Sequence, residues 1–384
     1  MRLLFVIPGL SGGGSERSLR ELVPTLVDNG IDVSIAYMVK RATDNKDELE
    51  HAGARLHLIT DVRLDGRARG VRRVIASERP NIVHTTLFEA DLAGRLAAWR
   101  APGCSPVVLS SIVNTSYDPV RLADPNIRAW KLRAARLIDG WTARHLTDHF
   151  HAVSGAVKTA TMQALGIDSH RITVVERGRD PVRLGEPSSD RRARARDALG
   201  LRQDARVIVT VGRQEFQKAQ SNLVRAFDLI AGKHAEAELL LVGRTGNESE
   251  KVRTQVGRSG YRDRIRVLGH RDDVPDVLAA ADVFALPSLY EGFPGAVIEA
   301  MALGLPVVAT QIPTMREVVE EGGSGFLVPP GNSERLADAI GRVLDDREVN
   351  RRLGNRGREL FLTRLTAAES HRRMIELYER LIAA

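Results

Sequence analysis

Short apolar runs alternate with helix-forming segments along the chain, and this alternation limits its fold more than any other feature. Each strand-like run is followed by an amphipathic helical pattern and then by another run, which is typical of β-α-β units that build parallel sheets. The runs form two series, separated by residues 181–205, where proline, serine and arginine cluster. A chain of 384 residues is long enough for two such domains.

The two series predict the fold class. Strands are expected at 3–8, 32–38, 81–84, 107–112, 149–153 and 172–175 in the first series, and at 207–211, 238–242, 265–268, 283–286 and 306–309 in the second. We therefore predict an α/β protein with Rossmann-like parallel-sheet domains at 1–180 and 206–365, a linker at 181–205, and a C-terminal helix at 366–384 that packs back on the N-terminal domain. Ligands bind beyond the carboxyl ends of strands in open α/β sheets, so we expect the domains to face each other across a shared cleft.

Composition excludes several classes of protein. The single cysteine, Cys104, rules out an intrachain disulfide and a metal cluster of two or more cysteines. No apolar run reaches the length of a membrane-spanning helix, and we interpret the hydrophobic N-terminus as a first strand rather than a signal peptide. Aromatic residues make up only 4% of the chain and do not interleave with basic ones, which disfavours nucleic acid as a partner.

The formal net charge of +7 is unevenly distributed. Residues 1–180 carry 25 Lys and Arg against 20 Asp and Glu. This excess favours an anionic partner, such as a lipid phosphate or a membrane surface, although a solvated arginine-rich surface is the alternative. Residues 128–144 form a basic amphipathic pattern with two tryptophans, which suggests a helix that contacts a membrane surface or a lipid-linked molecule, or else an ordinary helix with one solvated face.

The most specific motif lies in residues 282–310. Glu291 and Glu299 are separated by seven residues, and the segment Gly-Phe-Pro-Gly between them ends a loop and opens a helix. Proline suits the start of a helix, because its missing N–H has no intrahelical partner there. The backbone amides of residues 293–297 are then expected to be free to bind an anion such as a phosphate. Both carboxylates suit hydrogen bonds from sugar hydroxyls.

With this motif the chain resembles the family-four retaining glycosyltransferases of the GT-B fold (glycosyltransferase group 1). The resemblance implies that Glu291 contacts hydroxyls of a donor sugar and that Glu299 contacts the ribose of its nucleotide. It also implies that the intervening backbone contacts the sugar and the distal phosphate. That backbone belongs to Phe293, Pro294, Gly295, Ala296 and Val297.

A second motif places two cations after a strand. Arg213 follows the strand at 207–211 by two residues, and Lys218 lies five residues further on. A guanidinium and an ammonium together neutralise a diphosphate, which is their role at the leaving group in the family that the chain resembles. Ala219 stands where that family usually has glycine. Arg213, Lys218 and Glu291 are therefore the candidate catalytic residues.

Two further donor contacts follow from the resemblance. Gly13 and Gly14 lie at the turn after the first strand, where glycine lets a ligand approach the backbone, and they match the glycine loop that faces the donor phosphate and the acceptor. Their spacing is not a dinucleotide fingerprint. Backbone near Val267 and Gly269, next to His270, matches the segment that meets the nucleobase.

The sequence departs from the family pattern at two places. Asn114 stands near the position of the usual histidine, and an amide cannot act as a general acid or base. His84, at the end of an earlier strand, is the alternative polar group for the acceptor and cleft. At 177–180 the chain reads Arg-Gly-Arg-Asp in place of Asn-Gly-Ile/Val-Asp, and the added cations either bind an acidic group or pair with local carboxylates.

The resemblance implies a cytoplasmic retaining glycosyltransferase, with peripheral contact at the inner face of the membrane as a further expectation. No cofactor is expected beyond the nucleotide diphosphate sugar as co-substrate. No Asp-x-Asp triplet occurs, and because the cations serve the diphosphate, no metal is required. The donor sugar, its base and the acceptor hydroxyl stay open: a polysaccharide, a glycolipid or a natural product. The alternatives are a catalytically silent or epimerase-like sugar-nucleotide-binding protein and, disfavoured by the glycine spacing, a nicotinamide dehydrogenase.

Overall fold

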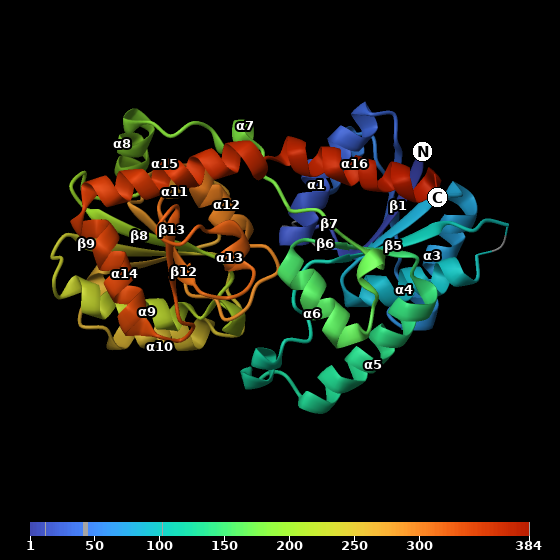
Figure 1. Ribbon diagram of the computed structural model, residues 1–384, viewed down its shortest axis with the longest axis horizontal. Helices are drawn as coiled ribbons and strands as arrows, with labels where there is room; N and C mark the ends of the chain where they lie inside the picture. The colour runs from blue at the N-terminus through green and yellow to red at the C-terminus, as the bar shows by residue number, and fades with distance from the viewer. Residues whose placement is uncertain (12, 41–44, 102, 384) are drawn as a thin grey trace. The chain divides into compact units, whose positions relative to one another are not determined.

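The computed structural model describes residues 1–11, 13–40, 45–101 and 103–383. The chain forms two compact units (Figure 1). Unit 1 comprises Met1–Pro119, Ile127–Arg177 and Ala367–Ala384, and unit 2 comprises Val120–Asn126 and Gly178–Thr366. Both are parallel α/β sheets, so the predicted fold class of two Rossmann-like parallel-sheet domains is confirmed.

The sheet of unit 1 has the strand order β3-β2-β1-β4-β5-β6-β7, and every described pair in it is parallel. Its strands are β1 (Arg2–Gly9), β2 (Asp32–Val39), β3 (Arg55–Leu58), β4 (Ile82–Thr86), β5 (Val107–Ile112), β6 (His149–Ala152) and β7 (Ile172–Val174). Its helices are α1 (Gly14–Asp28), α2 (Lys46–His51), α3 (Leu64–Glu78), α4 (Phe88–Trp99), α5 (Ala129–Leu146), α6 (Gly155–Leu165) and α16 (Ala367–Ala383).

Alternate residues of β1 reach two different cores, as the period of a strand requires. Phe5 packs with α1 and α16, and Val6 packs with α3 and α4 on the other face. Helix α16 lies in unit 1, where Leu377 and Tyr378 are buried and where His371 Nδ1 lies 2.9 Å from Thr25 Oγ1 of α1. The C-terminal residues are therefore part of the first core.

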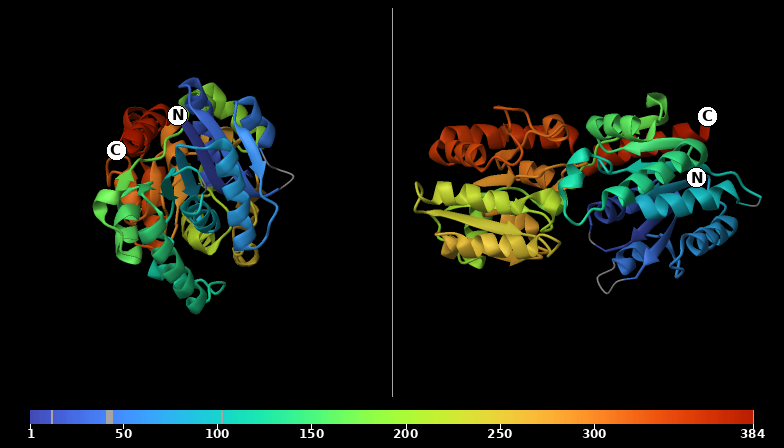
Figure 2. Two further views of the ribbon diagram at one scale, coloured as in Figure 1. Left: turned by 90° about the vertical axis from the view of Figure 1, so that its right-hand side faces the viewer. Right: turned by 90° about the horizontal axis from the view of Figure 1, so that it is seen from below.

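The sheet of unit 2 has the order β10-β9-β8-β11-β12-β13 and is also parallel. Its strands are β8 (Arg206–Val211), β9 (Ala237–Val242), β10 (Ile265–Gly269), β11 (Val283–Leu286), β12 (Val307–Thr310) and β13 (Gly325–Val328). Its helices are α7 (Pro181–Leu184), α8 (Ser189–Ala198), α9 (Gln220–Ala231), α10 (Ser249–Arg258), α11 (Val274–Ala279), α12 (Gly295–Ala302), α13 (Met315–Val318), α14 (Ser333–Asp345) and α15 (Arg347–Arg364). Helices cover both faces of each sheet (Figure 2).

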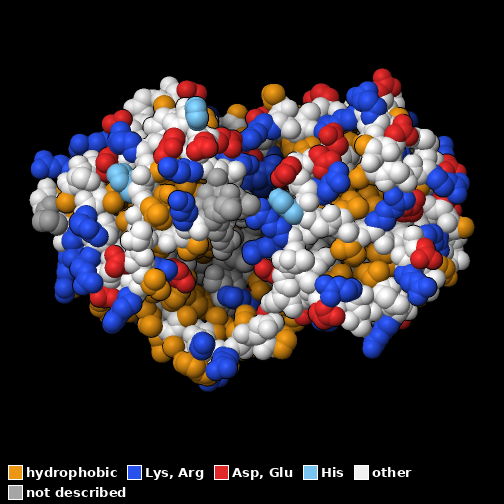
Figure 3. Space-filling model, turned by 180° about the vertical axis from the view of Figure 1, so that it is seen from behind, with side chains coloured by type: hydrophobic (Ala, Val, Ile, Leu, Met, Phe, Trp, Pro, Cys, Tyr) orange, Lys and Arg blue, Asp and Glu red, His pale blue; other side chains and the backbone are white. Residues whose placement is uncertain are grey.

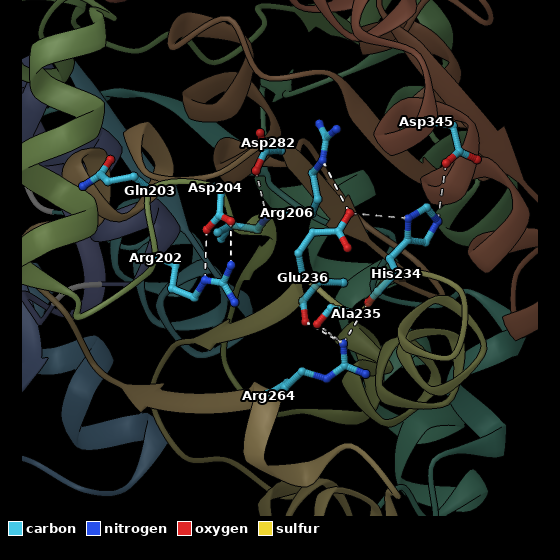
Figure 4. Close-up of polar contacts among 12 residues, drawn as sticks. Arg202, Gln203, Asp204, Arg206, His234, Ala235, Glu236, Arg264, Asp282 and Asp345 are labelled. Carbon is cyan, nitrogen blue, oxygen red and sulfur yellow. Dashed lines mark hydrogen bonds and ion pairs between the residues drawn. The ribbon is translucent and has the colours of Figure 1, made fainter.

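Arginine–carboxylate pairs tie the loops at the amino edge of the unit 2 sheet (Figure 4). Asp282, just before β11, accepts hydrogen bonds from the backbone N–H of Val207 at 2.7 Å and from Arg196 Nη2 at 2.9 Å. Arg196 is buried and also donates to the carbonyls of Ala280 and Gln203. Residues 181–205, predicted as a linker, thus hold α7 and α8 and lie within unit 2.

Local structure adds two features to the prediction. Helix α1 begins at Gly14, with Gly13 at the N-cap position. Strands β3 and β13 are not predicted by the sequence pattern; each is four residues long and lies at an edge of its sheet. Among the described residues, no helix combines the length and apolarity needed to span a bilayer.

Candidate active site

Glu291 joins the loops that follow two neighbouring strands of unit 2. It comes after β11, is 6% exposed, and accepts a hydrogen bond through Oε1 from Lys218 Nζ at 2.5 Å and from Ser288 Oγ at 2.7 Å. Its Oε2 accepts from Gln217 Nε2 at 3.0 Å. Lys218 and Gln217 belong to the 3-10 turn at Phe216–Lys218 after β8, which pairs directly with β11. The structure thus brings together two of the three predicted catalytic residues at the carboxyl edge of the sheet.

The turn between Glu291 and Glu299 leads into α12. Pro294 takes the N-cap position, one residue earlier than the first helical position expected for it, and Gly295 begins the helix. Phe293 is buried beneath the turn. The N–H of Val297 already donates to the Pro294 carbonyl at 3.1 Å, so the expectation that all amides of residues 293–297 are free is wrong at this position. The half-exposed first turn at Gly295 and Ala296 is the part suited to an anion.

Glu299 lies one turn further along α12 and is ion-paired within the protein. Its Oε1 accepts a hydrogen bond from Arg179 Nε at 2.8 Å, and both side chains are buried. Of the two alternatives for the added cations, Arg179 follows the second, because it pairs with a local carboxylate. Arg177 belongs to unit 1, where its Nη2 donates to Ser15 Oγ at 3.2 Å.

Arg213 lies on the expected loop but points outward. Its side chain is 63% exposed, and Nη1 lies 3.0 Å from Glu215 Oε1. By contrast, the stem of Lys218 passes over Gly212, where an added Cβ would lie 3.2 Å from Lys218 Cδ. The strand-end loop therefore orients the lysine towards Glu291, and the arginine has a different carboxylate partner.

The predicted nucleobase segment ends β10. Val267 is about half exposed, and Gly269 has a φ of +67°, a conformation that favours glycine. The Gly269 carbonyl accepts a hydrogen bond from the N–H of Gly243, which follows β9, at 2.8 Å. His270 lies next to Arg244, with 3.2 Å between Nε2 and Nη2. This segment lies at the same edge of the sheet as the loop of Lys218, two strands away.

The glycine turn of unit 1 connects β1 to α1. A Cβ on Gly13 would overlap the carboxylate of Glu16, and one on Gly14 would lie 3.4 Å from Arg177 Nη1. Glycine at position 13 therefore leaves room for the Glu16 carboxylate, whereas an added Cβ at position 14 would make only an ordinary contact with Arg177.

His84, the alternative polar group expected at the acceptor and cleft, forms its described hydrogen bonds inside unit 1. It is buried, its Nδ1 lies 2.8 Å from Tyr378 Oη of α16, and its Nε2 lies 2.6 Å from Ser111 Oγ. Ser111 Oγ in turn lies 2.7 Å from His151 Nδ1, and His151 Nε2 lies 2.9 Å from the Val175 carbonyl. Since a carbonyl only accepts, His151 donates to Val175 through Nε2. With neutral rings, Ser111 Oγ then donates to His151 Nδ1, His84 Nε2 donates to Ser111 Oγ, and Tyr378 Oη donates to His84 Nδ1.

This histidine relay of Tyr378, His84, Ser111 and His151 is held neutral. Burial lowers the pKa of His84 to about 3, with a further contribution from His151 nearby. Burial likewise lowers the pKa of His151 to about 4. With every ring nitrogen engaged and both rings uncharged, the relay ties α16 to the sheet.

Asn114 lies in the loop after β5, half-buried, and its Oδ1 accepts a hydrogen bond from the N–H of Thr115 at 2.9 Å. The same loop is anchored by Tyr117, whose hydroxyl donates to Asp139 at 2.7 Å. Asp139 also pairs with the buried Arg95 at 2.6 Å. The amide of Asn114 therefore orients its own loop, and no described contact gives it an acid–base partner.

The polar cluster around Arg95 was not identified from the sequence. Asp91 accepts a hydrogen bond from Thr85 Oγ1 at 2.5 Å, and burial raises the pKa of Asp91 to about 7, which the nearby Arg95 partly offsets. Its members are spread over β4, β5, α4 and α5, with no common motif spacing in the sequence. Among the described residues, no group of three or more His, Cys, Asp or Glu is placed to hold a metal ion.

Comparison with known proteins matches this two-unit architecture. The model for glycosyl transferases group 1 matches residues 191–360, and that for the glycosyl transferase 4-like domain matches residues 13–178. Phosphatidyl-myo-inositol mannosyltransferase of Mycobacterium leprae is 31% identical over 271 residues, which cover 62% of this chain and 68% of the relative. The chain belongs to the group 1 glycosyltransferases.

Other relatives of this glycosyltransferase match with different coverage. UDP-Gal:α-D-GlcNAc-diphosphoundecaprenol α-1,3-galactosyltransferase of Escherichia coli is 26% identical over 72% of this chain and 70% of the relative. N-acetyl-α-D-glucosaminyl L-malate synthase of Bacillus anthracis is 32% identical over only 42% of each chain. The chain thus spans less than half the length of some of the curated relatives that it matches.

Solved structures agree with the fold of the glycosyltransferase. HepE of Anabaena, crystallised with UDP-glucose, has a TM-score of 0.85 at 23% identity, covering 99% of this chain and all of that one. Sucrose-phosphate synthase of Thermosynechococcus elongatus has a TM-score of 0.86 at 21% identity and covers both chains fully. At these identities the likeness concerns the fold.

Proposed function

We propose that the protein transfers a glycosyl group from a nucleoside diphosphate sugar to an acceptor hydroxyl, with retention of anomeric configuration. The main support for this proposal is the hydrogen bond from Lys218 to Glu291, which lies in the loop that leads into the first turn of α12. A cation, a carboxylate and a helix N-terminus at one strand edge suit a diphosphate and the hydroxyls of an attached sugar.

The reaction builds negative charge on the diphosphate as its bond to the anomeric carbon breaks. Lys218 and the amides of Gly295 and Ala296 stabilise that charge, and Arg213 joins them by exchanging Glu215 for the diphosphate. Glu291 holds the sugar through its hydroxyls. The acceptor oxygen bonds to the anomeric carbon on the face that the phosphate leaves, and the acceptor proton passes to the departing phosphate oxygen.

This route needs no histidine base, which agrees with Asn114 and with the buried His84. It also needs no cofactor beyond the nucleotide sugar and no metal, because protein cations serve the diphosphate. Turnover is therefore expected to survive exhaustive treatment with a chelator. A loss of turnover that added Mg²⁺ or Mn²⁺ restores would contradict metal-independent transfer.

For the acceptor, we propose a lipid-linked molecule that carries a phosphate. Two of the relatives named above act on a diphosphoundecaprenol-linked sugar and on phosphatidyl-myo-inositol, as their names state, whereas the name of the third states L-malate. The positive charge of residues 1–180 supports the same chemistry, since phosphate favours a basic surface.

Helix α5 supports membrane contact by unit 1, at the inner face of the membrane. Trp130, Leu137 and Trp141 are at least half exposed on it, and the basic side chains of Lys131 and Arg133 lie among them. Hydrophobic and basic side chains gather at the lower part of the surface in Figure 3, where α5 lies. The acidic residue of this helix, Asp139, is buried and paired with Arg95, so the exposed face is basic and suits anionic lipid.

Liposome pelleting tests this contact. Wild-type protein is expected to sediment with vesicles containing anionic lipid, and the Trp141→Ser variant is expected to stay in the supernatant. Trp99→Ser is the matched control, because Trp99 is similarly exposed in unit 1 but lies on α4. Equal sedimentation of the two variants, or none of the wild type, would contradict membrane contact by α5.

Donor binding and cleavage test the transferase proposal itself. A thermal-shift screen with uridine, guanosine and adenosine diphosphate sugars is expected to select one base, with uridine first because HepE was crystallised with UDP-glucose. Slow hydrolysis of the bound donor separates an enzyme from a silent binding protein, which would leave the donor intact. Arg213→Ala is expected to lower turnover by about 10²–10³-fold, and near-normal turnover would remove Arg213 from the mechanism.

A further inference from the structure

Arg179 occupies a closely fixed position beside α12. It is 3% exposed, its backbone N–H donates to the Leu365 carbonyl at 2.9 Å, and its Nη1 donates to the Gly178 carbonyl at 3.0 Å. Its Nε donates to Glu299 Oε1 at 2.8 Å. The segment that begins the long stretch of unit 2 at Gly178 thus places a guanidinium beside a carboxylate 120 positions later in the sequence.

Gly295 is the residue that admits this guanidinium. A Cβ on Gly295 would overlap Arg179 Nη2, so Arg179 lies directly against the first turn of α12. The φ of Gly295 is not in the left-handed region. Close approach, rather than backbone conformation, is therefore the physical reason for glycine here.

A guanidinium is unfavourable beside the N-terminus of a helix, where the helix dipole is positive. Glu299 supplies the compensating negative charge from within the same helix. Because Arg179 is fixed through both its backbone and its side chain, the bond also holds the Glu299 carboxylate in one orientation. Arginine is well suited to hold a carboxylate in one orientation, because its planar guanidinium donates several hydrogen bonds in fixed directions.

We propose that Arg179 is a positioning residue for donor binding, which fixes the Glu299 carboxylate to accept hydrogen bonds from the ribose hydroxyls of the donor. This inference rests on the proposed function and on a ribose role for Glu299. Its consequence is a preference for ribose over deoxyribose in the nucleotide, and that preference depends on a residue that itself touches no ribose.

Calorimetric titration with UDP, 2′-deoxy-UDP and 3′-deoxy-UDP tests this dependence. Wild type is expected to bind UDP about 10- to 100-fold more tightly than at least one deoxy analogue, as for a hydrogen bond to a charged group. Arg179→Met and Glu299→Gln are each expected to abolish most of that preference. The double variant is expected to show no further loss, because residues that act together are not additive.

Arg196→Met is the matched control for a purely structural effect. Arg196 is the other fully buried, carboxylate-paired arginine at the described edges of unit 2, but it lies at the amino edge of the sheet. Its replacement is expected to lower thermal stability while the ribose preference stays at the wild-type ratio. If Arg179→Met behaves in the same way, Arg179 is only structural and the inference is overturned.

Gly295→Ala tests the same point without removing a charge, and it serves if Arg179→Met does not fold. The added methyl group displaces the guanidinium, so the ribose preference is expected to fall here too. A folded Gly295→Ala protein that keeps the full preference would overturn the inference.

If wild type binds UDP without any ribose preference, the inference fails and the proposed function stands. If wild type binds no nucleoside diphosphate at all, the proposed function fails.

Discussion

Two polar sets near the strand ends, one in each unit, differ in kind. On the α16 face of unit 1, the histidine relay crosses three strands with neutral rings and hydroxyls. At the carboxyl edge of unit 2, one ion pair joins Lys218 to Glu291 in the loop before α12, and another joins Arg179 to Glu299 on α12. The relay is buried, and the ion pairs are buried apart from the partly exposed Lys218, but only the ion pairs hold charge.

This difference indicates what each unit can bind. A neutral relay with every ring nitrogen engaged offers no charge to a ligand, so it stabilises the fold. An ion pair at a strand edge offers a cation and a carboxylate that a diphosphate and a sugar hydroxyl can approach, because such groups form strong charge-assisted hydrogen bonds. Polar residues near a strand end are therefore candidates for a binding site when they hold charge, not merely because they are polar.

Lys218→Ala gives the largest expected effect in this comparison. Removing the ammonium takes one stabilising group from the proposed diphosphate site, and among the described residues Ser288 and Gln217 then remain as side-chain partners of Glu291, so turnover is expected to fall by about 10²–10³-fold. Steady-state kinetics with the selected donor measure this. Lys251→Ala is the control, since Lys251 is about half exposed on α10 and pairs with Glu248 at the N-cap of that helix. Near-normal turnover of Lys218→Ala would make the charged set of unit 2 structural as well.

Tyr378→Phe tests the neutral set and has a smaller expected effect. Loss of the hydroxyl leaves the buried Nδ1 of His84 without its donor, which costs about 1–3 kcal/mol of unfolding free energy. Urea denaturation measures the loss. Donor affinity of the folded variant is expected to match wild type, because the proposed donor carboxylates lie in unit 2. Reduced donor affinity at unchanged stability would give the relay a role in binding and would remove the contrast between the units.

The interior strands were predictable from the sequence, whereas two edge strands were not. Strands β5 and β11 have the predicted bounds. Strand β11, Val-Phe-Ala-Leu, is fully buried and forms an uninterrupted apolar run, and β5 begins with three apolar residues. Strand β3, with the sequence Arg-Leu-His-Leu, is half-exposed and pairs with β2 alone. Strand β13 is equally short and begins with glycine. A four-residue segment with one neighbour leaves little hydrophobic pattern to detect.

The loops of the site were also predictable, but the partners of their side chains were not. The pairing of Glu299 with Arg179 and of His84 with Tyr378 spans 120 and 294 positions, so only the folded chain reveals it. The outward orientation of Arg213 had a local signal, since Glu215 lies two residues away in the same loop. Motif spacing locates a residue on a strand end, and long-range packing decides whether its polar atoms face a ligand or the protein.

The pH dependence of stability gives the last and smallest expected difference between the units. His84 and His151 have an ordinary pKa of 6.5, lowered in the folded protein to about 3 and about 4. Below pH 6.5 the two histidines bind protons in the unfolded chain but stay neutral in the folded protein. Their contribution to the free energy of unfolding is therefore complete above pH 6.5 and decreases as the pH falls towards 4. Asp91, whose pKa is raised to about 7, acts in the opposite direction over part of this range, since the folded state binds its proton first.

Comparing wild type with His84→Gln isolates the relay, because Asp91 and His151 are present in both proteins. Between pH 7 and 5.5, wild type is expected to lose about 1 kcal/mol more unfolding free energy than the variant, which corresponds to one histidine that stays neutral when folded and protonates when unfolded. Urea denaturation at both pH values measures the two losses. Because the variant is less stable at either pH, the decisive quantity is the difference in slope. Equal slopes would mean that His84 accepts a proton in the folded protein, and the contrast between a neutral unit 1 relay and a charged unit 2 site would not hold.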